Sequence, residues 1–248
     1  MKRCFGLTGF PLGHSLSPAY FQQKFDIQGL ADHSYELFPL HSIHELQDLL
    51  KSRPDLCGLN VTVPYKQQIL PFLDELDPVA RDTGAVNTVR IERSENKTKL
   101  TGFNSDVYGF RESLKPLLSK EINQAIVLGN GGAAKAVKYV LNELSIPFLT
   151  VSRKPDEKDT ISWANLNPDL VSEHNLIIQC TPVGLHPDDP LLPFPFDALS
   201  GGHLVYDLIY NPVKTQFLEK SEQAGARIKN GYEMLCLQAD EAWRIWNI

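Results

Sequence analysis

The sequence has few of the residues that mark several well-known classes of protein. Only four of its 248 residues are cysteines, and none of them form a C-x-x-C pair. This scarcity argues against a disulfide framework and fits a reducing compartment, so a cytoplasmic location is expected. The seven histidines are dispersed along the chain, and we therefore predict no metal site.

Long hydrophobic runs and basic clusters are also lacking. No apolar segment approaches the length of a membrane span. The formal net charge is −6, which argues against a general nucleic-acid surface or an anionic-membrane surface. What is left is an ordinary globular protein, since 42% of the residues are hydrophobic and can supply a buried core.

Strand-like and helix-like segments alternate along the chain, and this alternation predicts an α/β fold. In the first part the expected elements are strands at 4–10, 34–40 and 57–63, helices at 17–25 and 41–52, and a hairpin at 84–93 and 97–104. After a connecting helix at 108–118, the expected elements are a strand, glycine turn and helix at 125–144, strands at 148–152, 175–181, 203–210 and 226–230, and helices at 215–225 and 232–246.

The character of the chain changes near residues 103–106, and we place a domain boundary there. The predicted domains are residues 1–104 and residues 105–231. The last helix, within 232–248, is expected to complete the first domain.

The segment AIVLGNGGAA carries the strongest local signal of the second part. Gly129, Gly131 and Ala134 have the G-x-G-x-x-G/A spacing between a strand and a helix. The first glycine permits the tight turn, the second lets the backbone approach a pyrophosphate, and the small third residue lets the helix pack closely. We therefore predict a Rossmann-type, doubly wound dinucleotide-binding domain, against the alternative of a merely tight strand-to-helix turn.

The residues after the next strand indicate which dinucleotide binds. An NAD-binding domain usually has an acidic residue there, whereas this chain has Ser152, Arg153 and Lys154. Two cations would pair with a 2′-phosphate and would gain nothing from a bare 2′-hydroxyl. We therefore favour NADP over NAD, although Asp156 keeps NAD open and the two cations could be ordinary solvated charges.

The segment NVTVPYK, residues 60–66, raises a question about its lysine. Pro64 suits the first turn of a helix, which places Lys66 near the positive end of the helix dipole. A structural lysine is disfavoured there, but a lysine that exchanges a proton with a substrate is favoured, since the field supports the neutral amine. On these residues alone, a solvated lysine is the stronger interpretation.

Several motifs together resemble those of the shikimate dehydrogenase family. They occur in the order GFPLGHSLSP, NVTVPYK, GAVNT, GFNSD, the glycine turn, CTPVG and NGYEMLCLQA. HSLSP and NVTVPYK are specific to that family, whereas the glycine turn belongs to many. The resemblance implies an N-terminal substrate-binding domain and a C-terminal NADP-binding domain with a cleft between them. It also implies the NADPH-dependent reduction of 3-dehydroshikimate to shikimate, on the way to chorismate and the aromatic amino acids.

The resemblance also implies the residues of the active site. Lys66 corresponds to the catalytic acid/base, and Asp106 to the aspartate that pairs with it; a helix cap is the alternative for Asp106. The substrate contacts would be Ser15, Ser17, Asn60, Thr62, Asn87, Tyr210 and Gln238. For Ser17 the sequence alone suggests a helix cap. The cofactor contacts would be Gly129, Asn130, Gly131, Gly132, Ala133, Ser152, Arg153, Lys154, Leu208 and Gly231.

Two other functions remain open on the sequence. One is an NAD-using quinate/shikimate dehydrogenase, which cofactor preference and a test with quinate would distinguish. The other is a non-catalytic sensor of dinucleotide or shikimate, against which Lys66 and Asp106 argue. The expected partner is the small-molecule substrate, without nucleic acid or membrane, and the expected assembly is a monomer or a homodimer.

Overall fold

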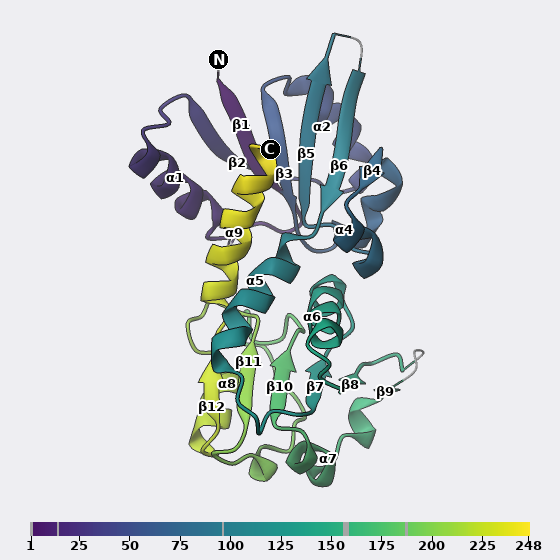
Figure 1. Cartoon of the computed structure of the whole chain (residues 1–248), viewed down its shortest axis with the longest axis vertical. Helices are drawn as coiled ribbons and strands as arrows, with labels where there is room; N and C mark the ends of the chain where they lie inside the picture. Colours follow the sequence, from purple (N-terminus) through teal and green to yellow (C-terminus); the bar gives the residue numbers. More distant parts are fainter. Residues whose placement is uncertain (1, 14, 96, 156–158, 187) are drawn as a thin grey trace. The chain divides into compact units, whose positions relative to one another are not determined.

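The computed structural model describes residues 2–13, 15–95, 97–155, 159–186 and 188–248. They form two compact units, one of Met1–Tyr108 with Gln238–Ile248 and one of Gly109–Leu237. Each unit contains its own six-stranded sheet (Figure 1), which confirms the predicted α/β class. The described residues contain no helix both long and apolar enough to cross a bilayer.

The first unit is built on a mixed sheet. Its strands are β1 Arg3–Gly9, β2 His33–Pro39, β3 Leu56–Val61, β4 Glu75–Leu76, β5 Thr88–Ser94 and β6 Lys97–Phe103. They lie in the order β2-β1-β3-β5-β6-β4. β1 pairs in parallel with β2 and β3, while β5 pairs antiparallel with β3 and β6. The antiparallel hairpin of β5 and β6 is the one that the sequence predicts.

Short helices connect the strands of this unit. They are α1 Ser17–Gln28, α2 Leu46–Ser52, α3 Tyr65–Gln68 and α4 Pro78–Thr83, with 3₁₀ turns η1 Ile43–Glu45 and η2 Leu70–Phe72. Ser17 does not cap α1, contrary to the expectation from the sequence alone. Leu16 is the N-cap residue and no side chain caps the helix; the Ser17 N–H donates to Ser15 Oγ at 3.2 Å in a local turn.

The second unit has a fully parallel sheet. Its strands are β7 Ala125–Leu128, β8 Phe148–Val151, β9 Thr160–Ile161, β10 Leu176–Gln179, β11 Leu204–Asp207 and β12 Arg227–Lys229. Their order is β12-β11-β10-β7-β8-β9, which runs outward in both directions from β7 and β10, as a doubly wound sheet does. β7, β10 and β11 are buried along their whole length, as expected for central parallel strands.

The helices of the second unit complete the alternation. They are α5 Ser105–Leu114, whose start belongs to the first unit, α6 Gly132–Glu143, α7 Pro168–Glu173 and α8 Gln216–Gln223, with 3₁₀ turns η3 Lys115–Leu117, η4 Trp163–Asn165 and η5 Phe196–Ala198. The two units thus divide inside α5, whereas the sequence places the boundary just before it.

The last helix, α9 Tyr232–Trp246, ends in the core of the first unit. The indole of Trp246 stacks on Phe5 with ring centroids 4.8 Å apart, and its Nε1 donates to Val89 O at 3.0 Å. Gly58 leaves the room for this ring, since a Cβ there would lie 2.4 Å from Trp246 Nε1. This packing fixes Gln238, which precedes Trp246 on the same helix, against the same unit.

Candidate active site

The predicted pair of Lys66 and Asp106 forms in the structure. Lys66 lies in α3 and Asp106 in the first turn of α5, and the Nζ donates to Asp106 Oδ2 at 2.6 Å. The exposed fractions of the two side chains are 15% and 9%, so water reaches the pair only in part. The backbone at Lys66 is held too, because Val86 N donates to Lys66 O at 2.7 Å.

The helix dipole, which the sequence suggests as the influence on the Lys66 amine, is weaker than expected. α3 contains only four residues, and a single turn aligns few peptide dipoles. The nearby carboxylate of Asp106 is a full charge at hydrogen-bond distance. The ion pair, and not the helix field, therefore dominates the surroundings of the ammonium.

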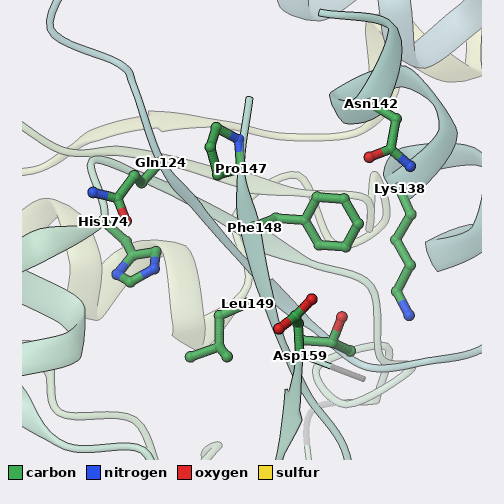
Figure 2. Close-up of a pocket in the computed structure, with 9 residues that line it drawn as sticks. Gln124, Lys138, Asn142, Pro147, Phe148, Leu149, Asp159 and His174 are labelled. Atoms are coloured by element: carbon green, nitrogen blue, oxygen red, sulfur yellow. The ribbon is translucent and has the colours of Figure 1, made fainter. Parts of the chain in front are cut away.

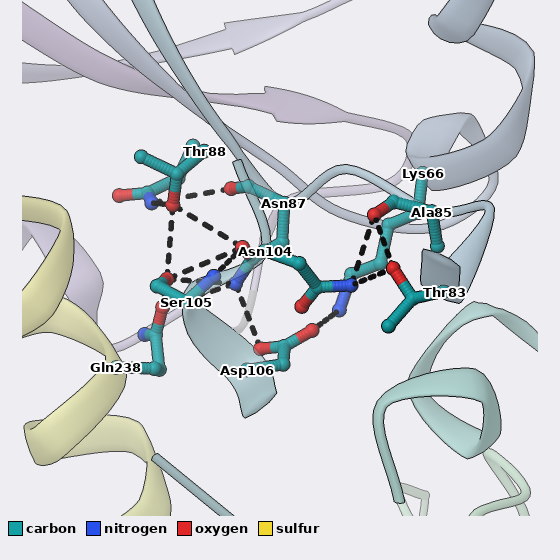
Figure 3. A network of polar contacts seen from close by, with 10 residues as sticks. Lys66, Thr83, Ala85, Asn87, Thr88, Asn104, Ser105, Asp106 and Gln238 are labelled. Carbon is teal, nitrogen blue, oxygen red and sulfur yellow. Dashed lines mark hydrogen bonds and ion pairs between the residues drawn. The ribbon is translucent and has the colours of Figure 1, made fainter. Parts of the chain in front are cut away.

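Asn87 connects Asp106 to the rest of a buried polar network (Figure 3). Its Nδ2 donates to Asp106 Oδ1 at 2.8 Å, while its Oδ1 accepts from Ser105 N at 2.7 Å. Both oxygens of Asp106 are thus engaged, one by Lys66 and one by Asn87. Such an arrangement fixes the carboxylate in one orientation toward the lysine.

Asn60 joins the same network from the neighbouring strand. Its Nδ2 donates to Thr88 Oγ1 at 3.2 Å, and its Oδ1 accepts from Tyr35 Oη at 2.8 Å. Asn60 and Thr88 are register partners in the antiparallel pair of β3 and β5. The pairing therefore brings together two segments that are far apart in the sequence.

Gln238 reaches the network from α9. Its Oε1 accepts from Asn87 Nδ2 at 3.4 Å and from Ser105 Oγ at 3.3 Å. Gln238 is 9% exposed, so burying its amide without these partners would cost folding free energy. Five of the predicted site residues, Asn60, Lys66, Asn87, Asp106 and Gln238, thus belong to one connected set.

The other predicted substrate residues lie outside this set. Ser15 is half-buried and Ser17 is buried, and their hydrogen bond fixes the start of α1. Thr62 is half-buried after β3, where its N–H donates to Thr8 O at 2.9 Å. Tyr210 belongs to the second unit, beyond the end of β11, and is half-buried. Contact of all seven predicted residues with a substrate stays a prediction.

The glycine turn of the second unit has the tight bend, open space and close packing that its sequence predicts. Gly129 has φ +109°, which strongly favours glycine, and a Cβ there would lie 3.0 Å from Thr181 Cγ2. Gly131 precedes the first residue of α6, and the space beside it is open to 4 Å. Ala134 is fully buried against the sheet. The turn thus leaves room for a pyrophosphate beside the start of α6. The other predicted cofactor residues of this turn are Asn130, Gly132 and Ala133.

The end of β8 presents the two predicted cations to solvent. Arg153 and Lys154 are exposed, and Ser152 Oγ accepts from Lys154 N at 3.2 Å. Ser152 itself is anchored, since its N–H donates to Ile161 O at 2.9 Å. Asp156, which kept NAD open, lies outside the described residues. The residues present therefore fit a phosphate better than a bare hydroxyl.

Leu208 and Gly231 meet at the end of the parallel sheet. Leu208 N donates to Gln179 O at 3.0 Å, and Gly231 N donates to Ile209 O at 3.0 Å. A Cβ on Gly231 would lie 2.0 Å from Leu208 O, so only glycine fits this close approach. The two residues form a tight backbone corner that any side chain at 231 would open.

Two acidic groups, the buried Asp207 and the half-buried Cys180, lie near this corner. Burial raises the pKa of Asp207 to about 6, although hydrogen bonds from Thr215 and Ile209 oppose the rise. Burial also raises the pKa of the Cys180 thiol, and the Asp207 charge adds to this rise. The thiol is therefore protonated at neutral pH and is no nucleophile.

Several residues of the network were missed in the sequence. Ser105 lies in the GFNSD motif between two residues of obvious interest, and its neighbours could have drawn attention to it. Thr88 and Tyr35 look like ordinary strand residues, and only the pairing of the strands shows their role. In the second unit, the sequence did not indicate Lys138, whose Nζ donates to Asn130 Oδ1 in the glycine turn at 2.6 Å.

Comparison with known proteins gives a consistent picture. The family model of the shikimate dehydrogenase substrate binding domain matches residues 7–89. A shikimate dehydrogenase (NADP(+)) of Desulforamulus reducens is 37% identical, over 97% of this chain and 88% of the relative.

Solved structures are similar over nearly the whole chain as well. A shikimate 5-dehydrogenase from Thermus thermophilus, solved in complex with NADP(H) and shikimate, is 32% identical with a TM-score of 0.84, covering 98% of this chain and 93% of that one. A quinate dehydrogenase from Corynebacterium glutamicum, solved in complex with NAD, is 27% identical with a TM-score of 0.86, covering 99% and 93%.

Proposed function

This chain belongs to the shikimate dehydrogenase family, and we propose that it catalyses the reversible, NADPH-dependent reduction of 3-dehydroshikimate to shikimate. The observation that carries the proposal is the Lys66–Asp106 pair, held at 2.6 Å inside a buried polar network. A protein that only binds a ligand needs no such acid/base pair. We also propose that residues 1–104 with 232–248 form the substrate domain, and residues 105–231 the dinucleotide domain.

In this mechanism Lys66 moves the proton. NADPH, when bound, supplies the hydride that reaches the carbonyl carbon. The Lys66 ammonium donates a proton to the carbonyl oxygen as negative charge develops there, and the resulting amine regains a proton from solvent. In the oxidising direction the neutral amine accepts the proton of the hydroxyl. Asp106 keeps the Nζ in place throughout, and Asn87 keeps Asp106 in place.

Substrate recognition would use the remaining polar groups of the first unit, with Tyr210 added from the second. A carboxylate with vicinal hydroxyls needs hydroxyl and amide partners, which are the groups of Ser15, Ser17, Asn60, Thr62, Asn87, Tyr210 and Gln238. Hydrogen bonds already order three of these amides: Asn60 bonds to Thr88, Asn87 to Asp106, and Gln238 to Ser105. Such preorganisation supports binding because little side-chain freedom remains to be lost.

The cofactor is proposed to be NADP, with Arg153 and Lys154 facing its 2′-phosphate. We expect Arg153→Ala to raise the KM for NADPH by about tenfold, since it removes a charge-assisted contact, and to leave the KM for NADH nearly unchanged. Initial rates with each nucleotide at saturating 3-dehydroshikimate measure both values. An equal rise for the two nucleotides would contradict the assignment.

The function itself is tested by following nicotinamide absorbance with 3-dehydroshikimate, in parallel with NADPH and NADH, and in the reverse direction with shikimate and quinate. We expect turnover with NADPH and shikimate. Turnover with NADH and quinate would instead favour the NAD-using relative, whose solved example is similar in fold. Binding of dinucleotide without any turnover would favour a sensor.

A further inference from the structure

Lys138 lies in the second turn of α6, and its side chain reaches back toward the glycine turn. Its Nζ donates to Asn130 Oδ1 at 2.6 Å. Asn130 is the central residue of the G-x-G sequence, directly between the two glycines that shape the turn. The ammonium is therefore held beside the backbone that would cradle a bound dinucleotide.

The Lys138 side chain also lies beside residues of β8. Lys138 lines a cavity of about 550 Å³ together with Thr150, Phe148 and Asp159 (Figure 2). The cavity's other lining residues include Gln124, Pro147 and His174, which precede β7, β8 and β10, so the cavity itself lies toward the amino ends of these strands. Lys138 thus lies beside the glycine turn, through Asn130, and beside β8, the strand whose following loop carries the exposed cations. Dinucleotide folds place the adenosine ribose between such a turn and the end of such a strand.

The charge of Lys138 acts on the Cys180 thiol, which follows β10. Burial is the main cause of the raised pKa of Cys180, and the Lys138 ammonium opposes that rise. Its field therefore extends to the end of β10. Asp159, a charged group of opposite sign, lines the same cavity and offsets part of this field.

We propose that Lys138 is a further determinant of NADP specificity, a third cation for the 2′-phosphate; this rests on NADP as the cofactor of the proposed function. Arg153 and Lys154 are exposed, so solvent and salt screen their charges. Lys138 is half-buried and anchored by Asn130, so its charge is screened less. The bare 2′-hydroxyl of NAD would gain little from this charge, so the Lys138 ammonium would favour binding of NADP over NAD.

The experiment compares Lys138→Gln with the wild type by isothermal titration calorimetry. Glutamine keeps a donor for Asn130 but carries no charge, and Lys220→Met on α8 is the matched control for removal of an exposed lysine from the same unit. We expect Lys138→Gln to weaken binding of NADP⁺ and of 2′,5′-ADP by about tenfold, while NAD⁺ and 5′-AMP change less than about twofold. Lys138→Arg should restore most of the NADP⁺ affinity because it restores the charge.

The outcomes separate the inference from the proposed function. Unchanged NADP⁺ affinity in Lys138→Gln would overturn the role of Lys138 alone. An equal loss for NADP⁺ and NAD⁺ would overturn it too, because it would mean that Lys138 only supports the turn. A wild-type protein that binds NAD⁺ but no NADP⁺ would overturn both the inference and the proposed cofactor. If Lys138→Gln does not fold, Asn130→Ala releases the anchor and should weaken NADP⁺ more than NAD⁺.

Discussion

Replacing Lys66 with methionine isolates the proton-transfer step. Methionine is unbranched like lysine and fills a similar space, but it has no proton to give. Positioned acid/base groups contribute about 10²- to 10⁴-fold to rate. The Lys66 side chain is 15% exposed, so water has limited access as a substitute donor. We therefore expect kcat to fall by about 10³- to 10⁴-fold, which corresponds to about 4–5.5 kcal/mol of activation free energy.

The same substitution has a second cost, which must be measured separately. Asp106 is 9% exposed and would lose its cation, while Asn87 would still donate to one of its oxygens. We expect the free energy of unfolding to fall by about 1–3 kcal/mol, as for a buried acceptor that loses a partner. Urea unfolding of the variant measures this loss and shows over which conditions the variant is folded.

The assay is NADPH oxidation by 3-dehydroshikimate under conditions where the variant is folded. Lys51→Met is the matched control, because Lys51 is in the same unit, is also paired with an aspartate, and is 76% exposed; it should retain the wild-type kcat. NADP⁺ affinity should be unchanged in Lys66→Met, since the glycine turn belongs to the other unit. A folded Lys66→Met protein with kcat within about tenfold of wild type would refute the role of Lys66.

Two further predictions address the network and the second unit. Gln238→Leu removes the acceptor that Asn87 shares, so the KM for shikimate should rise by about tenfold in steady-state assays; an unchanged KM would contradict a role at the substrate. In the wild type, the folded pKa of Asp207, about 6, exceeds its unfolded value, so the free energy of unfolding falls as pH rises from about 4 to 6. Asp207→Asn removes this titrating carboxyl and can still bond to its partners Thr215 and Ile209. The variant should therefore gain up to about 3 kcal/mol of unfolding free energy relative to wild type between pH 4 and pH 7, and a pH-independent difference in urea unfolding would contradict this.

Much of the fold could be predicted because its signals are local. Apolar runs between glycine and polar turns predict buried parallel strands, and β7, β10 and β11 are such runs. The glycine turn was also readable, since the φ of Gly129 and the burial of Ala134 follow from residue size. The start of α1 was wrong because Ser17 is already the first helical residue; Leu16 is the N-cap, and no side chain caps the helix.

The site could not be derived in the same way, because its parts meet only through tertiary structure. Lys66 and Asp106 are separated by 40 positions, and only the family motifs predicted their pairing. Nor does the sequence distinguish a solvated lysine from a paired one. The one physical reason that it offered, the helix dipole, is weak in a helix of four residues.

The amides show why burial decides function here. In the sequence, Asn60 and Asn87 could be turn residues, because asparagine is common in turns. In the structure β3 and β5 pair so that Asn60 lies opposite Thr88, which places both amides beside the start of α5. Once buried, each amide must find partners, and those of Asn87 include the carboxylate of Asp106 besides Ser105 and Gln238. The requirement to satisfy buried polar groups thus orients the carboxylate, and the carboxylate in turn holds the Lys66 ammonium at the place where a proton is to be transferred.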